Sequence, residues 1–318
     1  TKPGDANDNT KLLQFPSADK KDEYIHRMGI LNNIVKKHNE RGKSDEMIAQ
    51  EYEIYPEMAY LIPGMRNDID LGFDNENGKI KISDSANIKR LWEVNDNKVR
   101  YPTAIDRYLD YIYDVVYEDL LHKQYNIEAN GEGNVHTQLW FLPTHLRGDG
   151  SAKTDKDDSV FDVISRGLAS TIINNKHFKN FNVCIIHSLV NKGETTIKDN
   201  TGKDRIFLKC IKGDVKTCIQ DVENETQKQK RSLIILTGKR LRLGISLPCV
   251  DIAIHMDPIE SYDIMYQSMF RVLTERKGKR KGFFVDMIAD RSVKFIYNYA
   301  IQEKAQTNND RIHKDDIK

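Results

Sequence analysis

The feature that most constrains this sequence is an alternation of short apolar runs with amphipathic stretches in its second half. Apolar runs that are rich in β-branched and aromatic residues and have the length of strands occur at residues 138–143, 181–188, 232–237, 250–257 and 282–287. Amphipathic stretches between them predict helices at residues 155–176, 214–230 and 261–273. Strands and helices in this order predict an α/β fold, a mostly parallel sheet with helices on both faces.

The first part of the chain has a different pattern. Residues 1–20 are polar and lack periodicity, which predicts a flexible linker. Residues 21–130 are predicted to be a mainly helical region, with the clearest helix after Pro102, where apolar residues recur at Ile105, Leu109, Ile112, Val116 and Leu120. A glycine-rich joint at 128–134 predicts a boundary to a domain at residues 131–295. Residues 296–318 are predicted to form a C-terminal helix or tail.

Two smaller patterns accompany these elements. Residues 194–213 resemble a hairpin inserted between the second strand and its helix, and residues 78–83 are typical of a short hairpin. Four tyrosines on the helix after Pro102 either pack in the core or stack on bases: Tyr108, Tyr111, Tyr113 and Tyr117.

Charge and cysteine content restrict the function classes. The 49 Lys and Arg residues balance the 48 Asp and Glu residues, so any surface for nucleic acid must be local. The four cysteines have no close-pair spacing, so we expect reduced thiols and no metal site. The sequence has no apolar run of membrane-spanning length and no signal-peptide pattern, so we expect an intracellular protein. Because the chain opens on a loop-like segment without Met, we expect it to be a piece of a larger protein.

A phosphate-binding loop is the first requirement for tight nucleotide binding. Gly42-Lys43-Ser44 matches the end of that motif, but Lys37 stands where the upstream glycine is needed. The Thr-Gly-Lys sequence that begins at Thr237 also lacks the upstream glycine. The first strand is not followed by the glycine pattern of dinucleotide-binding enzymes either. We therefore expect no tight ATP binding by this chain alone.

A basic loop follows the third predicted strand. Lys239, Arg240 and Arg242 lie next to Gly244, which lets the backbone approach a partner closely. Open parallel sheets bind ligands at the carboxyl ends of their strands, which is where this loop begins. The loop either meets phosphates or is simply solvated, and charge alone does not separate the two interpretations.

The helix predicted at 261–273 has two distinct faces. An apolar stripe is formed by Met265, Met269, Val272 and Leu273, and a polar face by Gln267, Arg271 and Thr274. An arginine held on a packed helix can donate a rigid fork of N–H groups to a phosphate. Pairing with a surface carboxylate is the alternative.

The order of these pieces resembles the second RecA-like domain of superfamily 2 helicases over about 150 residues. The segment from Thr237 to Pro248 resembles motif V, with Gly238 and Gly244 in matching places, and Gln267 and Arg271 match motif VI. The strand at 138–143 takes the place of motif IV. The resemblance implies a RecA-like fold for residues 131–295. The form of the segment that resembles motif VI is most similar to that of the helicases of large double-stranded DNA viruses.

The chain also departs from the family pattern. Phe270 replaces the motif VI glycine, Thr274 stands at the second arginine, and Arg276 comes two residues later. Ser246 replaces a frequent motif V aspartate, which puts a ribose contact in doubt.

The resemblance implies an ATP-dependent helicase or translocase whose ATP and Mg²⁺ are held mainly by a first motor domain absent from this chain. Arg271, with Arg276 in reserve, is the expected arginine finger. Gln267, Thr237, Gly238 and Gly244 are expected to couple the nucleotide state to movement. Contacts to a DNA or RNA backbone are expected from Lys239, Arg240, Arg242, Lys277, Lys279 and Arg280.

Residues 21–130 would then be an insertion between the motor domains or an accessory domain. The expected location is the cytoplasm, a virus factory or a virion. The alternative function is a non-catalytic helicase-like scaffold or transcription-factor subunit.

Overall fold

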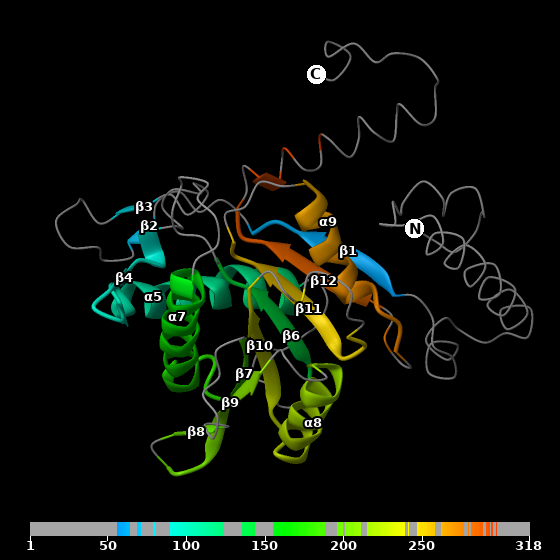
Figure 1. Cartoon of the computed structure of the whole chain (residues 1–318). Coiled ribbons are helices and arrows are strands. Elements are labelled where there is room, and N and C mark those ends of the chain that lie inside the picture. Colours follow the sequence, from blue (N-terminus) through cyan, green and yellow to red (C-terminus); the bar gives the residue numbers. More distant parts are fainter. Residues whose placement is uncertain are drawn as a thin grey trace, which may run out of the picture.

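The computed structural model describes residues 56–63, 69–70, 79–80, 90–123, 135–143, 155–187, 196–199, 201–210, 215–238, 241, 247–257, 262–276, 279, 281–288, 291–292, 294 and 297. An eight-stranded sheet in the order β1-β12-β11-β6-β10-β7-β9-β8 forms its centre (Figure 1). All neighbouring strands pair in parallel except β8 and β9. The predicted α/β fold with a mostly parallel sheet is therefore confirmed.

All five predicted strands are present. They are β6 (Thr137–Phe141), β7 (Phe181–His187), β10 (Ser232–Thr237), β11 (Val250–His255) and β12 (Lys281–Asp286). Every residue of β6 and β10 is buried. Helices cover both faces of the sheet, so these strands need apolar side chains on both sides and appear in the sequence as continuous apolar runs.

Two sets of helices cover the two faces of the sheet (Figure 1). One set comprises α5 (Pro102–Ile112), its π-helical continuation η1 (Tyr113–His122) and α7 (Asp155–Asn174). The other comprises α8 (Val215–Lys228), α9 (Tyr262–Met269) and the 3₁₀ turn η3 (Phe270–Leu273). Along β6, Trp140 packs with the first set while Leu139 and Phe141 pack with the second, as the two-residue period of a strand requires.

A strand that the sequence did not predict lies at one edge of the sheet. β1 (Glu57–Leu61) pairs in parallel with β12, so the helical prediction is wrong for these residues. The run is short and lies between Pro56 and Pro63, which disfavour a continuous helix. Pairing with β12, more than 200 residues away in the sequence, decides its conformation.

The end of β12 is fastened to β1 by a buried carboxylate. The side chain of Asp286 is fully buried and accepts hydrogen bonds from the hydroxyls of Tyr60 (3.0 Å) and Ser292 (2.7 Å). Arg291 forms an ion pair with it. Burial, followed by the charge of Asp286, raises the pKa of Tyr60. The acidic residue that ends the last strand is therefore a structural anchor in this fold.

The remaining described strands are short. β8 (Thr196–Lys198) and β9 (Asp204–Cys210) form the predicted hairpin, and β9 also joins the sheet beside β7. β3 (Lys79–Ile80) pairs with β2 (Ile69–Asp70) rather than within residues 78–83 as predicted. β4 (Val94–Asn95) and β5 (Lys98–Val99) are joined by Asp96 and Asn97, whose positive φ angles fit a two-residue hairpin turn.

The tyrosines of α5 and η1 pack in the core. Tyr108 and Tyr117 are fully buried, and the hydroxyl of Tyr117 donates to the side-chain oxygen of Gln138 on β6. The indole of Trp140 donates to the same oxygen (2.8 Å). Because α5 and η1 share one hydrophobic cluster with the sheet, the core extends across the domain boundary predicted near residue 131.

Candidate functional site

The segment resembling motif V begins at the carboxyl edge of the sheet. Thr237 ends β10 and is fully buried, and its carbonyl accepts a hydrogen bond from the backbone N–H of Leu142 (2.9 Å). Its hydroxyl is buried and has no hydrogen-bond partner among the residues that the structure describes. A buried hydroxyl without a partner costs about 1–3 kcal/mol, so this position favours a bound donor or acceptor.

Two leucines anchor the rest of this segment. Lys239, Arg240, Arg242 and Gly244 lie outside the described residues. Leu241 and Leu247 are buried in the same hydrophobic cluster as the apolar stripe of α9. Leu241 and Leu247 therefore belong to the hydrophobic layer that also holds the apolar stripe of α9.

The helix resembling motif VI has the two faces predicted from its sequence. Met265, Met269 and Val272 are buried, whereas Leu273 is only half-buried. Gln267, Arg271 and Thr274 are all half-buried. The polar face therefore remains accessible while the apolar stripe fixes the helix on the sheet.

Phe270 stands where the family has glycine, and the helix changes character there. α9 ends at Met269 and tightens into the 3₁₀ turn η3, which carries Arg271. The ring of Phe270 packs edge-to-face on Tyr266, with centroids 4.9 Å apart, against the cluster beneath α9. The bulky side chain is therefore accommodated by packing.

η3 lies unusually close to the sheet. A Cβ atom placed on Gly282 would lie 2.1 Å from the carbonyl oxygen of Val272 and 2.8 Å from its Cβ. Only glycine permits this approach between β12 and η3. Gly282 thus sets the distance between the sheet and the turn that carries Arg271.

Arg271 lies over a different part of the sheet from Thr237. η3 contacts β1, β11 and β12, whereas Thr237 ends β10, which is separated from β11 by β6. Burial lowers the pKa of the Arg271 guanidinium from its ordinary value. The structure therefore places this cation in a partly dehydrated position, where its interaction with an anion is stronger than in water.

Arg276 and Lys279 belong to a group of side chains at the amino edge of the sheet, here called the amino-edge cluster: Glu223, Cys249, Asp251, Arg276 and Lys279. The guanidinium of Arg276 forms an ion pair with Asp251 (2.6 Å) and donates to the carbonyl of Cys249 (3.3 Å). Glu223 on α8 lies 4.0 Å from the same guanidinium. Arg276 therefore ties α8 to the start of β11.

Lys279 is buried in the same cluster. Its ammonium donates to the carbonyls of Val250 and Thr274 (3.1 Å to the latter), and 4% of the residue is exposed. Burial lowers the pKa of Lys279 to about 8 and raises that of the Cys249 thiol to about 12. Burial also raises the pKa of Glu223.

These contacts correct two of the site predictions. The Lys279 ammonium cannot reach a nucleic-acid phosphate while it caps two buried carbonyls, so the backbone contact predicted for it is wrong in this conformation. Arg276 can act as a reserve arginine finger only after it leaves Asp251 and Cys249. Lys277 and Arg280 lie outside the described residues.

The amino-edge cluster links the ends of the two segments that resemble helicase motifs. Cys249 and Val250 directly follow the segment that resembles motif V, and Arg276 and Lys279 follow the residues that resemble motif VI. The contacts of Arg276 and Lys279 were not foreseen from the sequence. The carboxylates that pair with Arg276, Asp251 and Glu223, belong to no motif. An acidic residue at the start of a buried strand is the signal that could have indicated a buried cation.

Within the described residues, no three His, Cys, Asp or Glu side chains are grouped as metal ligands would be. None of the helices found there is long and apolar enough to cross a membrane.

Comparison with known proteins adds little to this geometry. No family model matches the chain, and no curated protein matches it in sequence. Among solved structures, the helicase Lhr of Mycobacterium smegmatis, bound to single-stranded DNA and AMP-PNP, is similar at 10% sequence identity and a TM-score of 0.33. The match covers 80% of this chain and 22% of that chain, so this chain spans less than a quarter of that protein. A likeness at this level carries no argument about function.

Proposed function

We propose that this chain is the second motor domain of an ATP-dependent helicase or translocase of superfamily 2. The observation that carries the proposal is the join between the two motif segments at the amino-edge cluster. Arg276 binds Cys249 and Asp251, and Lys279 binds Val250, so a shift of motif VI is transmitted directly to the start of β11 and to the segment that precedes it.

In this proposal Arg271 is the arginine finger. It is carried on η3, which Gly282 holds close to the sheet, and its guanidinium is partly dehydrated. Such a cation can donate two parallel N–H groups to a phosphate and stabilise charge that develops during phosphoryl transfer. Gln267 lies one helical turn earlier on the same polar face. In this proposal it couples movement of Arg271 to movement of α9.

The described residues fit a domain that contacts ATP from one side and does not itself enclose the nucleotide. Thr237 offers a buried hydroxyl with no partner among the described residues, and Gly238 follows at the carboxyl edge, where parallel sheets bind ligands. We propose that ATP and Mg²⁺ are held by a first RecA-like domain of the intact polypeptide, where they supply the phosphoryl group and neutralise its charge. Arg271 then approaches from this domain.

Nucleic acid is the proposed track, contacted through the phosphate backbone. The proposed contacts are Lys239, Arg240, Arg242, Lys277 and Arg280, with Gly244 allowing close approach. Binding through phosphates releases counterions, so we expect weak binding of single strands that falls as salt rises. A titration without salt dependence argues against this surface. The resemblance to viral helicases remains a prediction.

The decisive experiment compares Arg271→Ala with Arg166→Ala in the intact polypeptide. Removal of an arginine finger lowers kcat by roughly 10³-fold or more, while ATP binding changes little. Arg166 is a matched control, because it pairs with Asp162 on the surface of α7. An Arg271→Ala enzyme that keeps its kcat refutes the arginine finger. The present chain alone should show no ATP turnover, since it lacks a phosphate loop.

A non-catalytic scaffold is the second candidate, favoured by the engagement of Arg276. Arg276, two residues after the position where the family has its second motif VI arginine, is committed to Asp251 and Cys249. The intact polypeptide distinguishes the two functions, because a scaffold hydrolyses no ATP even with nucleic acid present. Upstream sequence without a phosphate loop would lead to the same conclusion.

A further inference from the structure

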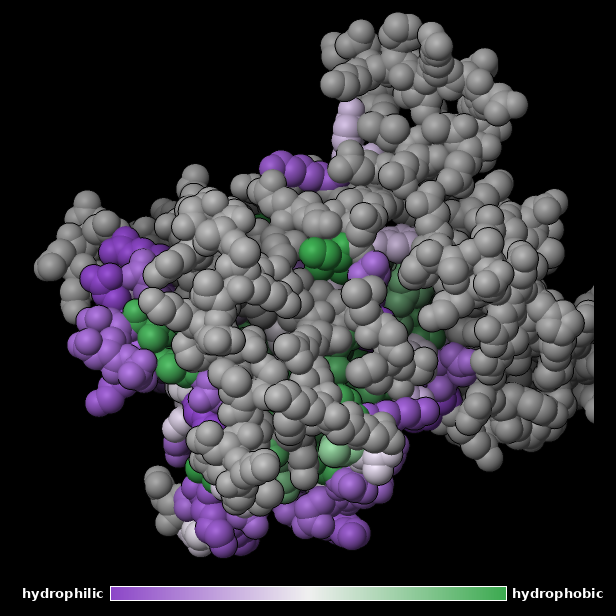
Figure 2. Space-filling model, viewed as in Figure 1, coloured by the Kyte–Doolittle hydropathy of each residue, from purple (hydrophilic) through white to green (hydrophobic). Residues whose placement is uncertain are grey.

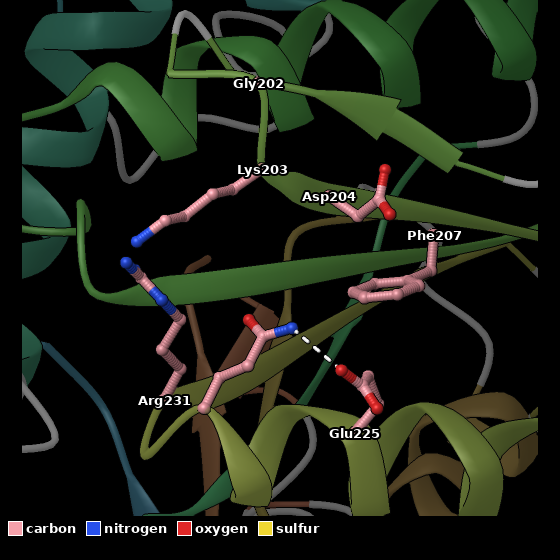
Figure 3. A pocket seen from close by; sticks show the side chains of 7 residues that line it. Gly202, Lys203, Asp204, Phe207, Glu225 and Arg231 are labelled. Carbon is pink, nitrogen blue, oxygen red and sulfur yellow. Dashed lines mark hydrogen bonds between the residues drawn. The ribbon is translucent and has the colours of Figure 1, made fainter.

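A cavity of about 510 Å³ opens between the β8–β9 turn and the C-terminal end of α8 (Figure 3). Its lining residues are Gly202, Lys203, Asp204, Phe207, Glu225, Gln229 and Arg231. The volume is typical of small-molecule sites. On the face seen in Figure 2, hydrophilic residues gather over this end of the molecule, where β8, β9 and α8 lie.

The cavity is separate from the motif segments. β9 begins at Asp204 and β10 begins directly after Arg231, so the cavity lies at the amino edge of the sheet. Thr237, at the other end of β10, marks the carboxyl edge. A ligand in this cavity would therefore lie at the opposite edge of the sheet from Thr237, where the segment resembling motif V begins.

Two cations converge inside the cavity. The side chains of Lys203 and Arg231 enter from opposite walls, and their charged ends point toward one another (Figure 3). Arg231 uses one N–H group for the carbonyl of Lys179 (2.9 Å), and a guanidinium has five. Two like charges that face each other repel, so this arrangement favours an anion between them.

A third cation lies beneath them. Arg205 is buried and donates to the Asn182 side chain (3.0 Å) and the Phe181 carbonyl (2.6 Å). Burial, followed by the charge of Arg231, lowers the pKa of Arg205. Asp199, at 3.4 Å, is the carboxylate paired with it. The Arg205–Asp199 ion pair therefore adds little net charge near the two converging cations.

The acidic residues of the lining are engaged with other groups. Asp204 accepts a hydrogen bond from the Thr196 hydroxyl (3.0 Å) and lies 4.0 Å from the Lys198 ammonium. Glu225 accepts one from the Gln229 amide (3.2 Å). Asp204 is therefore paired with a cation outside the lining, whereas Glu225 keeps its negative charge.

The C-terminal carbonyls of α8 are also satisfied. The backbone N–H of Lys230 donates to the carbonyl of Gln227 (2.9 Å), and that of Arg231 donates to the carbonyl of Thr226 (3.1 Å). Lys230 takes a positive φ of 55° to close this turn. These carbonyls therefore do not compete for the Arg231 side chain.

We propose that this cavity binds a phosphate group, with Lys203 and Arg231 as its two cationic contacts. A guanidinium and an ammonium together match the oxygens and charge of phosphate. The mostly buried ring of Phe207 forms an apolar part of the wall, against which the organic part of a phosphorylated ligand packs. The proposal rests on this cavity alone and does not depend on the motor function.

The test is a calorimetric titration of the chain with inorganic phosphate, with a nucleoside monophosphate, and with an oligonucleotide carrying or lacking a 5′-phosphate. We expect saturable binding of phosphate and of the monophosphate. Lys203→Ala and Arg231→Gln should each weaken binding about tenfold or more, the loss of one charge-assisted contact. Lys216→Ala, at the other end of α8, removes the same charge and should leave binding unchanged.

The outcomes separate the sources of the phosphate. Binding of only the 5′-phosphorylated oligonucleotide indicates a strand end, whereas equal binding of both oligonucleotides indicates the backbone. Lys203 is exposed, so its variant should keep the wild-type Tm and report on binding alone. The proposal is overturned if no probe binds, or if Lys216→Ala weakens binding as much as Lys203→Ala.

Discussion

Gly282→Ala is predicted to displace the turn that carries Arg271. The added Cβ would lie 2.1 Å from the carbonyl oxygen of Val272, and the other atoms it meets are the carbonyl carbon and the Cβ of the same residue, which move only with the backbone. Carbon–oxygen contacts need more than 3 Å, so η3 or β12 must move by about 1 Å. Overpacking of a well-packed site costs about 1–3 kcal/mol, and a rigid backbone neighbour places this site near about 3 kcal/mol.

Thermal unfolding of the chain measures this cost. A loss of about 3 kcal/mol lowers Tm by roughly 6–12 °C in a domain of this size. Gly167→Ala is the matched control, because its Cβ would meet a side-chain atom of Val99 at 2.6 Å. That methyl group can rotate away, and alanine gains about 1 kcal/mol of helix propensity on α7. We expect its net effect to stay within about 1 kcal/mol.

The reasoning fails if Gly282→Ala keeps the wild-type Tm, or if both variants lose the same stability. A second readout links the contact to the proposed function. In the intact polypeptide, a displaced η3 should lower ATP turnover under conditions where the Gly282→Ala protein is still folded. If the Gly282→Ala protein has a lowered Tm but hydrolyses ATP at the wild-type rate, the packing argument holds and the link between η3 and the arginine finger fails.

Two further predictions concern charged groups. Arg276→Ala should lower the free energy of unfolding by about 1–2 kcal/mol in urea, because the guanidinium is 37% exposed and the lost ion pair is partly screened; no change in the urea midpoint would contradict its role as a clamp. Hydrogen bonds, the largest from the Thr201 hydroxyl, lower the pKa of Asp199 from 3.8 to about 2. Its contribution to stability is therefore fully present above about pH 4 and lost as pH falls toward 2, so Asp199→Asn should flatten the stability profile in that window. An unchanged acid profile in the Asn variant would count against this assignment.

The sheet was largely predictable because its strands are buried on both faces. A run such as Ser232–Thr237 has one stable environment, the middle of a covered parallel sheet, so its apolar content identifies it. β1 has no such signature. Its residues Met58, Ala59 and Tyr60 are only partly buried, and the partner that holds the strand, β12, is far away in the sequence.

Candidate site residues could be named from the sequence only where a motif resemblance pointed to them. Thr237, Gln267 and Arg271 were chosen from order and spacing along the chain, and their roles stay predictions. The engagement of Arg276 was not, because its partners Asp251 and Glu223 belong to elements that folding brings to the same edge. A basic run in a sequence indicates charge, but it does not indicate which ammonium or guanidinium the fold buries.

The two positions at which the chain departs from the motif VI pattern have different structural consequences. Phe270 does not disturb η3, since its ring packs on Tyr266 and the close backbone approach is supplied by Gly282 on β12. The change at Thr274 is different, because the next arginine, Arg276, serves the fold instead. If this domain works in a motor, Arg271 must therefore stabilise the transferring phosphate without a second arginine from this helix, which makes kcat unusually dependent on that one side chain.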